Sequence, residues 1–198
     1  MEQESKLYAR ISDIMYLPKE QRDESALQLG YDVVKQDDDR ALFVSKETGT
    51  AVVGFRGTDL KKNSRMWRDV ATDTAVLLGK ADKTPRLIAN ERFLQDVIHT
   101  KQYKDIKLTG HSLGGLGATK LGQEYGLETH AYNPAFGIPE IAKSWKDRII
   151  QRKNNTNLKL YTTWGDPISF GVMASLTGKV YTQKKKEGIP RHALVNFL

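Results

Sequence analysis

The spacing of apolar side chains alternates along the chain between helical and extended patterns. Between residues 7 and 29 the apolar positions recur at helical spacing, and Gly30 is typical of a helix end. The segments 41–46 and 50–55 are rich in Val and Phe and flank a Glu-Thr-Gly sequence. This arrangement predicts a β-hairpin with a short loop.

In the rest of the chain, short apolar segments alternate with stretches of helical spacing. The predicted strands are 106–109, 129–132 and 158–164, and the predicted helices are 85–98, 113–125, 138–150 and 168–177. Strands that alternate with helices indicate an α/β fold with a small, mostly parallel sheet flanked by helices. Neither a linker nor a repeat divides the chain, so we expect residues 1–198 to form one domain.

Composition narrows the chemistry. The chain has no cysteine, which excludes disulfides, thiolate metal sites and a cysteine nucleophile. The formal net charge is +7, and a basic surface can attract nucleic acid, anionic lipid or acidic proteins. Apart from residues 184–186 the basic residues are scattered, and no nucleic-acid-binding motif is present. We therefore expect no nucleic-acid partner.

The segment Gly110-His111-Ser112-Leu113-Gly114 has the pattern Gly-x-Ser-x-Gly. It lies between a predicted strand and a predicted helix, where a serine nucleophile would be lifted above the sheet on a strained turn. The glycines keep that turn uncrowded, and the helix N-terminus favours developing negative charge. The alternative is a glycine-rich turn that binds phosphate. It is weakened by the lack of a Walker lysine and of a Gly-x-Gly-x-x-Gly motif.

A serine nucleophile needs a histidine base, and the chain has four histidines. Hydrolases with this turn place the base after the nucleophile in the chain, which excludes His99 and His111. His130 lies inside a predicted strand and is interpreted as structural. His192 follows a loop and precedes an apolar segment that we expect to be a terminal helix, so it can reach the top of the sheet.

The histidine needs a carboxylate that fixes its tautomer. Asp166 follows the strand 158–164 and precedes Pro167, at the carboxyl end of a strand, where sites of α/β proteins gather. The alternative is a turn-forming Gly-Asp-Pro sequence. Asp147 is the second choice, but it falls in a predicted helix.

The tetrahedral intermediate of acyl transfer needs at least two N–H donors. One is expected from Leu113, the residue after the nucleophile, and the other from the loop after an early strand. The segment 50–55 continues into Arg56-Gly57-Thr58. Gly57 lets the backbone approach the substrate, so the Thr58 amide is the second candidate donor.

These motifs together resemble the class 3 lipases, the fungal-lipase-like branch of the α/β-hydrolases. The matching segments span most of the chain in the family's order: VVGFRGTD at 52–59, LTGHSLGG at 108–115, AYNPAFG at 131–137, YTTWGDPIS at 161–169 and HALVNFL at 192–198. The combination of FRGTD, GDPIS and HALVNFL is more specific than GHSLGG, which other hydrolases share.

The resemblance implies a catalytic triad of Ser112, Asp166 and His192 and an oxyanion hole built from Thr58 and Leu113. It also implies a lid between Asp59 and about Asp73. A tryptophan flanked by arginines there suits a water–lipid boundary; the candidate lid residues are Arg65, Trp67 and Arg68. A polar surface loop is the alternative for this segment.

We therefore expect a carboxylic ester hydrolase that acts on glycerolipids, phospholipids or small esters, needs no cofactor or metal, and contacts anionic membranes peripherally. The polar start of the chain and the lack of cysteine favour a cytoplasmic or intracellular protein, or a virus-associated one, over a secreted lipase. Two other hypotheses remain. One is a lipid-binding or structural hydrolase-fold protein with a vestigial site, and the other is a nucleic-acid binder.

Overall fold

A computed structural model describes residues 3–58, 84–135, 157–166, 168–169 and 178–198. The predicted helix at 138–150, Asp147 and the candidate lid therefore lie outside the described residues, as does the predicted helix at 168–177 apart from its first two residues. The same holds for the three lid residues, Arg65, Trp67 and Arg68.

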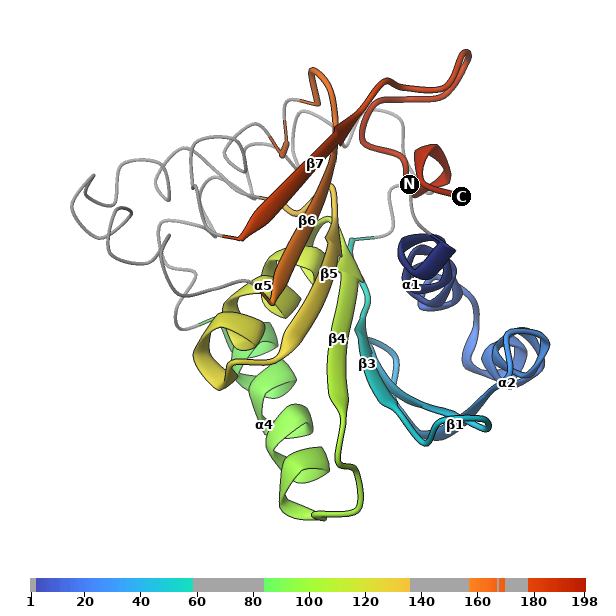
Figure 1. The fold of residues 1–198 in the computed structure, drawn as a ribbon, viewed down its shortest axis with the longest axis vertical. Coiled ribbons are helices and arrows are strands. Elements are labelled where there is room, and N and C mark those ends of the chain that lie inside the picture. Colours follow the sequence, from blue (N-terminus) through green and yellow to red (C-terminus); the bar gives the residue numbers. More distant parts are fainter. Residues whose placement is uncertain (1–2, 59–83, 136–156, 167, 170–177) are drawn as a thin grey trace.

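A seven-stranded sheet runs through the described residues in the order β1-β2-β3-β4-β5-β6-β7 (Figure 1). The first three strands are antiparallel, whereas β3 to β7 are all parallel. The mostly parallel α/β sheet predicted from the sequence is confirmed, with two additional strands, β1 and β7. The strands are β1 (Tyr31–Gln36), β2 (Arg40–Ser45), β3 (Ala51–Phe55), β4 (Ile106–His111), β5 (Glu128–Tyr132), β6 (Leu158–Thr163) and β7 (Lys179–Gln183).

Helices cover both faces of this sheet. Figure 1 shows the two N-terminal helices on one side and the two later helices on the other. The helices are α1 (Gln3–Ile14), α2 (Lys19–Gln28), α4 (Pro85–His99) and α5 (Leu113–Tyr125). Their termini follow the sequence signals. The Thr84 side chain accepts a hydrogen bond from the Leu87 amide at 3.3 Å, and Gly126 ends α5 with φ 67°.

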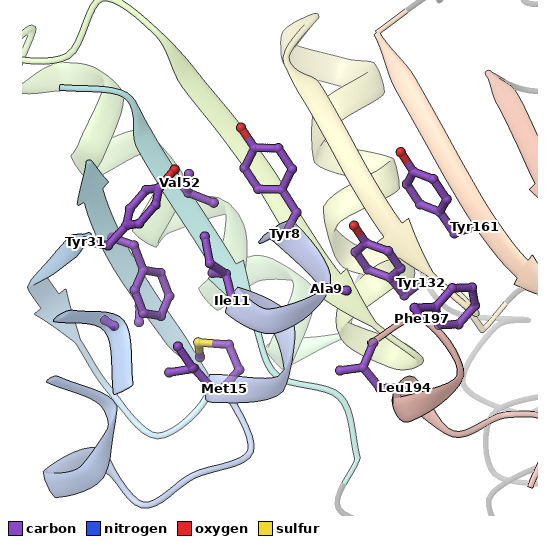
Figure 2. Close-up of a cluster of buried hydrophobic side chains, with 14 residues drawn as sticks. Tyr8, Ala9, Ile11, Met15, Tyr31, Val52, Tyr132, Tyr161, Leu194 and Phe197 are labelled. Atoms are coloured by element: carbon purple, nitrogen blue, oxygen red, sulfur yellow. The ribbon is translucent and has the colours of Figure 1, made fainter. Parts of the chain in front are cut away.

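Because successive side chains of a strand point to opposite faces of the sheet, the hydrophobic core is divided between those two faces. Phe43 and Val52 point toward α1, whereas their neighbours Leu42 and Val53 point toward α4 and α5. Figure 2 shows the first cluster, in which α1 packs over the sheet beside the C-terminal segment. Both clusters are built from buried side chains, so the sheet is fixed from both sides at the strands that carry the candidate site.

The C-terminal segment differs from the sequence-based expectation. Residues after His192 form only a short 3-10 turn, η3 (Leu194–Asn196), rather than an α-helix. Leu194 and Phe197 are buried in the cluster of Figure 2, so packing rather than helix length holds this segment on the sheet. None of the described helices has the length and hydropathy needed to cross a bilayer.

Candidate active site

Ser112 occupies a strained backbone conformation between β4 and α5. Its φ is 57° and its ψ is −124°, a region that costs a non-glycine residue on the order of 1–3 kcal/mol. The surrounding backbone holds this conformation. The Ser112 amide donates to the Tyr132 carbonyl at 3.1 Å, and the Ser112 carbonyl accepts from the Leu116 and Ala135 amides at 3.0 Å each. The turn therefore presents the hydroxyl above the carboxyl edge of the sheet.

Glycines make this turn sterically possible. A methyl group built onto Gly114 would overlap the Phe55 carbonyl, and one on Gly110 would lie 2.5 Å from the Gly114 carbonyl oxygen. A methyl group on Gly57 would lie 2.5 Å from the carbonyl oxygen of His111. The loop after β3 and the start of α5 thus approach each other more closely than any side chain allows.

The structure brings together three side chains that the sequence places far apart. His192 Nε2 lies 2.8 Å from Ser112 Oγ, and His192 Nδ1 lies 2.7 Å from Asp166 Oδ2. All three residues are buried, and none is more than 3% exposed. An ionised carboxylate only accepts hydrogen bonds, so Nδ1 carries the proton and Nε2 of a neutral imidazole accepts from the serine hydroxyl. This is the geometry that a serine nucleophile and its base require.

The carboxylate of Asp166 is held ionised by its neighbours. Burial alone raises the pKa of Asp166, but hydrogen bonds from His192, Ser169 and the Ile168 amide outweigh it, so the pKa lies below its ordinary value. Ser169 Oγ donates to Oδ2, the oxygen that also faces His192, and the Ile168 amide donates to Oδ1 at 3.2 Å. Ser169 is a residue that sequence reasoning missed, although it stands three positions after Asp166.

His111 braces the histidine of the site from behind. Its Nε2 lies 2.7 Å from the His192 carbonyl oxygen, and its Nδ1 lies 2.7 Å from the Tyr16 hydroxyl. Burial, followed by the nearby His192, lowers the pKa of His111 to about 3. His111 is therefore neutral, with its proton on Nε2 toward the carbonyl, and Nδ1 accepts from Tyr16. Sequence reasoning excluded His111 as the base but did not anticipate this contact.

Asn133 connects two strand ends and a loop around the site. Its backbone lies in the left-handed region at φ 39°, which asparagine tolerates better than most residues. Its Oδ1 accepts from the Thr163 amide at 2.8 Å, and its Nδ2 donates to the Arg191 carbonyl at 3.1 Å. The end of β5 is thereby tied to the end of β6 and to the loop that carries His192.

The loop that carries Thr58 is held by ionic and backbone contacts. Arg86 Nη2 donates to the Arg56 carbonyl at 2.6 Å and to Asp39 Oδ1 at 3.1 Å. The Arg56 amide in turn donates to the Asp39 carbonyl at 2.8 Å. The predicted oxyanion residues, Thr58 and Leu113, both line a cavity of about 380 Å³ beside the turn that carries Ser112.

That cavity has mostly apolar walls. Pro85 and Leu87 from α4 and Leu116 and Gly117 from α5 line it, and the polar groups come from Thr58, Thr84, Arg86, Asn90 and Lys120. Its position next to Leu113 places an apolar space beside the serine. Such a space suits the hydrocarbon part of an ester.

His130, in β5, belongs to a different cluster of side chains. Its Nε2 lies 3.1 Å from Glu128 Oε1, and Glu4 completes a group of three possible metal ligands. The same carboxylates already bind lysines: Glu128 contacts Lys107 at 2.9 Å and Lys159 at 2.7 Å. Ammonium groups occupy the ligand oxygens, so this cluster is an ionic network that ties α1 to the sheet.

Comparisons with known proteins add a family and a fold. A family model described as an uncharacterised protein family, UPF0227, matches residues 63–166. Among curated protein sequences none matches the chain significantly. A fungal lipase–inhibitor complex, solved as a model for interfacial activation in lipases, has 16% sequence identity and a TM-score of 0.50. The match covers 80% of this chain and 69% of that lipase.

A second solved structure, a mutant form of MDLA from Penicillium cyclopium, is 16% identical with a TM-score of 0.42. That match covers 94% of this chain and 80% of the Penicillium protein. At these identities the likeness to the lipase–inhibitor complex establishes the fold alone: the chain has the α/β-hydrolase fold found in fungal lipases.

Proposed function

The chain belongs to the uncharacterised protein family UPF0227, whose description carries no activity, and from its site geometry we propose that it is a serine esterase of the lipase type. We also propose that residues 1–198 act as one hydrolase domain. Within the α/β-hydrolases we propose a relation to the class 3 lipases, which the chain resembles in the motif combination FRGTD, GDPIS and HALVNFL.

One observation carries this proposal. Ser112 Oγ, the imidazole of His192 and the carboxylate of Asp166 form a continuous hydrogen-bonded chain, although 80 residues separate the serine from the histidine. The serine also occupies a strained turn at the N-terminus of α5. Side chains that only pack in a core do not require a strained serine, a buried carboxylate and an imidazole in one hydrogen-bonded chain. Nucleophilic catalysis uses all three.

Each step in the transfer of an acyl group to water can be given to one of these residues. His192 Nε2 takes the proton of Ser112 as Oγ attacks the ester carbonyl, and Asp166 stabilises the imidazolium that forms. The amides of Leu113 and Thr58 would hold the oxyanion. His192 then gives the proton to the leaving alkoxide. A water activated by the same Nε2 hydrolyses the acyl-enzyme and restores the serine.

The cavity indicates the class of ester. Its mostly apolar walls and its position beside Leu113 suit an acyl chain rather than a charged or sugar group. Glycerolipids, phospholipids and small soluble esters all provide such a chain. The chemistry needs neither a metal nor an organic cofactor, because the described side chains provide the nucleophile, the base and the orienting acid.

Hydrolysis of p-nitrophenyl butyrate tests the proposal. Ser112→Ala should lower kcat/KM by at least about 10³-fold, as expected for loss of a triad nucleophile. Ser45→Ala, in the hairpin at the far edge of the sheet, serves as the matched control and should leave turnover within about twofold. Turnover by Ser112→Ala at the wild-type rate would refute the proposal.

A further inference from the structure

An exposed tryptophan stands at the rim of the candidate site. Trp164 follows β6 and precedes Asp166 by two positions, and 70% of its surface is exposed. Large aromatic side chains usually bury most of their area, so this exposure has an energetic cost in water. Exposed tryptophans of this kind are typical of surfaces that meet a membrane interface or another macromolecule.

A basic loop adjoins this tryptophan. The Trp164 amide donates to the Gln183 carbonyl at 2.8 Å, immediately before the lysine run 184–186. On the other side, a methyl group built onto Gly165 would lie 3.1 Å from Arg191 Nε. We call the exposed group at this rim the rim patch; it consists of Trp164, Lys184, Lys185, Lys186 and Arg191.

One buried side chain holds the loop 184–191, which carries the basic residues of the rim patch. Asn196 Oδ1 accepts from the Lys186 amide at 2.9 Å, and Asn196 Nδ2 donates to the Pro190 carbonyl at 2.8 Å and the Arg191 carbonyl at 3.1 Å. Asn196 is only 3% exposed. The lysines are therefore carried on a fixed base that also leads directly into His192.

Charge at the rim patch is one-sided. Residues 184–191 contain four cationic side chains and a single carboxylate, Glu187, and all five are exposed. The loop continues beyond the carboxyl end of β7, at the edge of the sheet where β6 also ends (Figure 1). This loop therefore carries a local excess of positive charge at the end of the sheet that carries Ser112.

We propose that the rim patch docks the protein on an anionic phospholipid surface. Each basic residue near an anionic leaflet gains on the order of 1 kcal/mol, and tryptophan prefers the headgroup boundary where one part of the ring is apolar and the other is wet. A nucleic acid would match the charge as well, but the patch adjoins a site whose neighbouring cavity has a mostly apolar wall surface. An anionic lipid surface therefore accounts for the basic charge, for the exposed Trp164 and for the position of the patch beside the candidate site.

Docking would set the orientation of the enzyme. Arg191 precedes His192 and Trp164 precedes Asp166, so a surface that contacts the patch lies next to the mouth of the site. This inference rests on the proposed function for its lipid substrate, but the binding itself requires no turnover.

Vesicle co-sedimentation at physiological salt tests the proposal. Wild-type protein should bind phosphatidylglycerol–phosphatidylcholine vesicles and not pure phosphatidylcholine vesicles. The triple variant K184Q/K185Q/K186Q should lower the partition coefficient about 100-fold, and Trp164→Ala about tenfold. The matched control is K46Q/K101Q/K104Q. It removes the same charge at the opposite end of the sheet and should lose less than about threefold.

The outcomes separate this inference from the proposed function. Equal losses in the two triple variants would show that overall charge, not the rim patch, drives binding, and would overturn the proposal. So would absence of binding to anionic vesicles, or displacement of the protein from them by equimolar single-stranded RNA. Ser112→Ala should bind vesicles as wild type does, whereas failure of the proposed function would appear only as absent hydrolysis of a soluble ester.

Discussion

His111 Nε2 lies 2.7 Å from the backbone carbonyl oxygen of His192. The two imidazole rings are 4.9 Å apart between centroids, so the first histidine forms part of the wall against which the second rests. Tyr16 fixes the tautomer of His111 through a hydrogen bond of 2.7 Å to Nδ1. The position of the proposed base therefore depends on a hydroxyl contributed by the segment after α1.

Tyr16→Phe should weaken this positioning without removing any reacting group. Loss of the hydroxyl lets the proton of His111 move to Nδ1, and the His192 carbonyl then loses its donor. We expect kcat for a soluble ester to fall about three- to tenfold with KM nearly unchanged, in line with one hydrogen bond of about 1 kcal/mol. Tyr103→Phe is the control. An equal loss in the control, or a change confined to KM, would contradict this role.

Arg86 should influence activity by holding the loop that carries Thr58, and not through its positive charge. Its Nη2 joins Asp39 to the Arg56 carbonyl, and the shorter lysine side chain cannot place its ammonium at the same point. We expect Arg86→Lys to lower kcat about tenfold, because a small displacement of Thr58 weakens oxyanion binding. Arg92→Lys, at an exposed position of the same helix, should retain wild-type kcat. Equal kcat in both variants would exclude Arg86 from this role.

Asn133 should contribute more to stability than an exposed asparagine does. Asn133→Ala leaves the buried Thr163 amide without its side-chain acceptor and removes one of the two side-chain donors to the Arg191 carbonyl, the other being Asn196; losses of this kind cost about 1–3 kcal/mol each. Chemical denaturation should therefore show a decrease in the free energy of unfolding on the order of 3 kcal/mol. Asn157→Ala removes an exposed bond to the Gly126 carbonyl and should cost under about 1 kcal/mol. A reversed order of the two variants would contradict the assignment.

Two buried histidines should make the fold sensitive to mild acid. Burial lowers the pKa of His111 to about 3 and that of His130 to about 4, from 6.5 in an unfolded chain. Between pH 6.5 and 4 the unfolded chain binds protons that the folded chain does not, so stability falls as the pH falls. Each histidine contributes a slope of up to roughly 1.4 kcal/mol per pH unit.

The slope of unfolding free energy between pH 7.5 and 5.5 measures this effect, because Glu128, whose folded pKa is lowered to about 2, adds to the slope only as the pH approaches its unfolded pKa of 4.5. His130→Gln should reduce the slope by about half whatever it does to absolute stability, because one of the two groups no longer titrates. Asn157→Ala, which removes no ionisable group, is the control and should leave the slope in this window unchanged. An unaltered slope in His130→Gln would rule out the linkage.

Sequence patterns predicted the parts of this fold whose signals are local. Apolar alternation identified the central strands, Thr84-Pro85 and Gly126 marked helix ends, and the chain order of Ser112, Asp166 and His192 selected the three residues that the structure brings together. The edge strands β1 and β7 were missed because both are largely exposed and lack a continuous apolar face.

The bracing residues were missed for a different reason. The contact of Tyr16 with His111 spans 95 positions and that of Arg86 with Arg56 spans 30, so no local pattern encodes them. Asn133 stands before Pro134, where it looks like an ordinary turn residue. Only the packed sheet reveals that its amide joins β5, β6 and the loop of His192.

Covalent labelling with a fluorophosphonate probe, followed by peptide mass spectrometry, tests the central claim most directly, because the probe reacts with an activated serine and not with a merely hydrogen-bonded one. Our account predicts one adduct on Ser112, absent in Ser112→Ala and strongly reduced in His192→Ala, while Ser169 and Ser45 remain unmodified. Folded wild-type protein that carries no adduct on Ser112, or that is labelled equally after loss of His192, would contradict the account and favour a lipid-binding protein with a vestigial site.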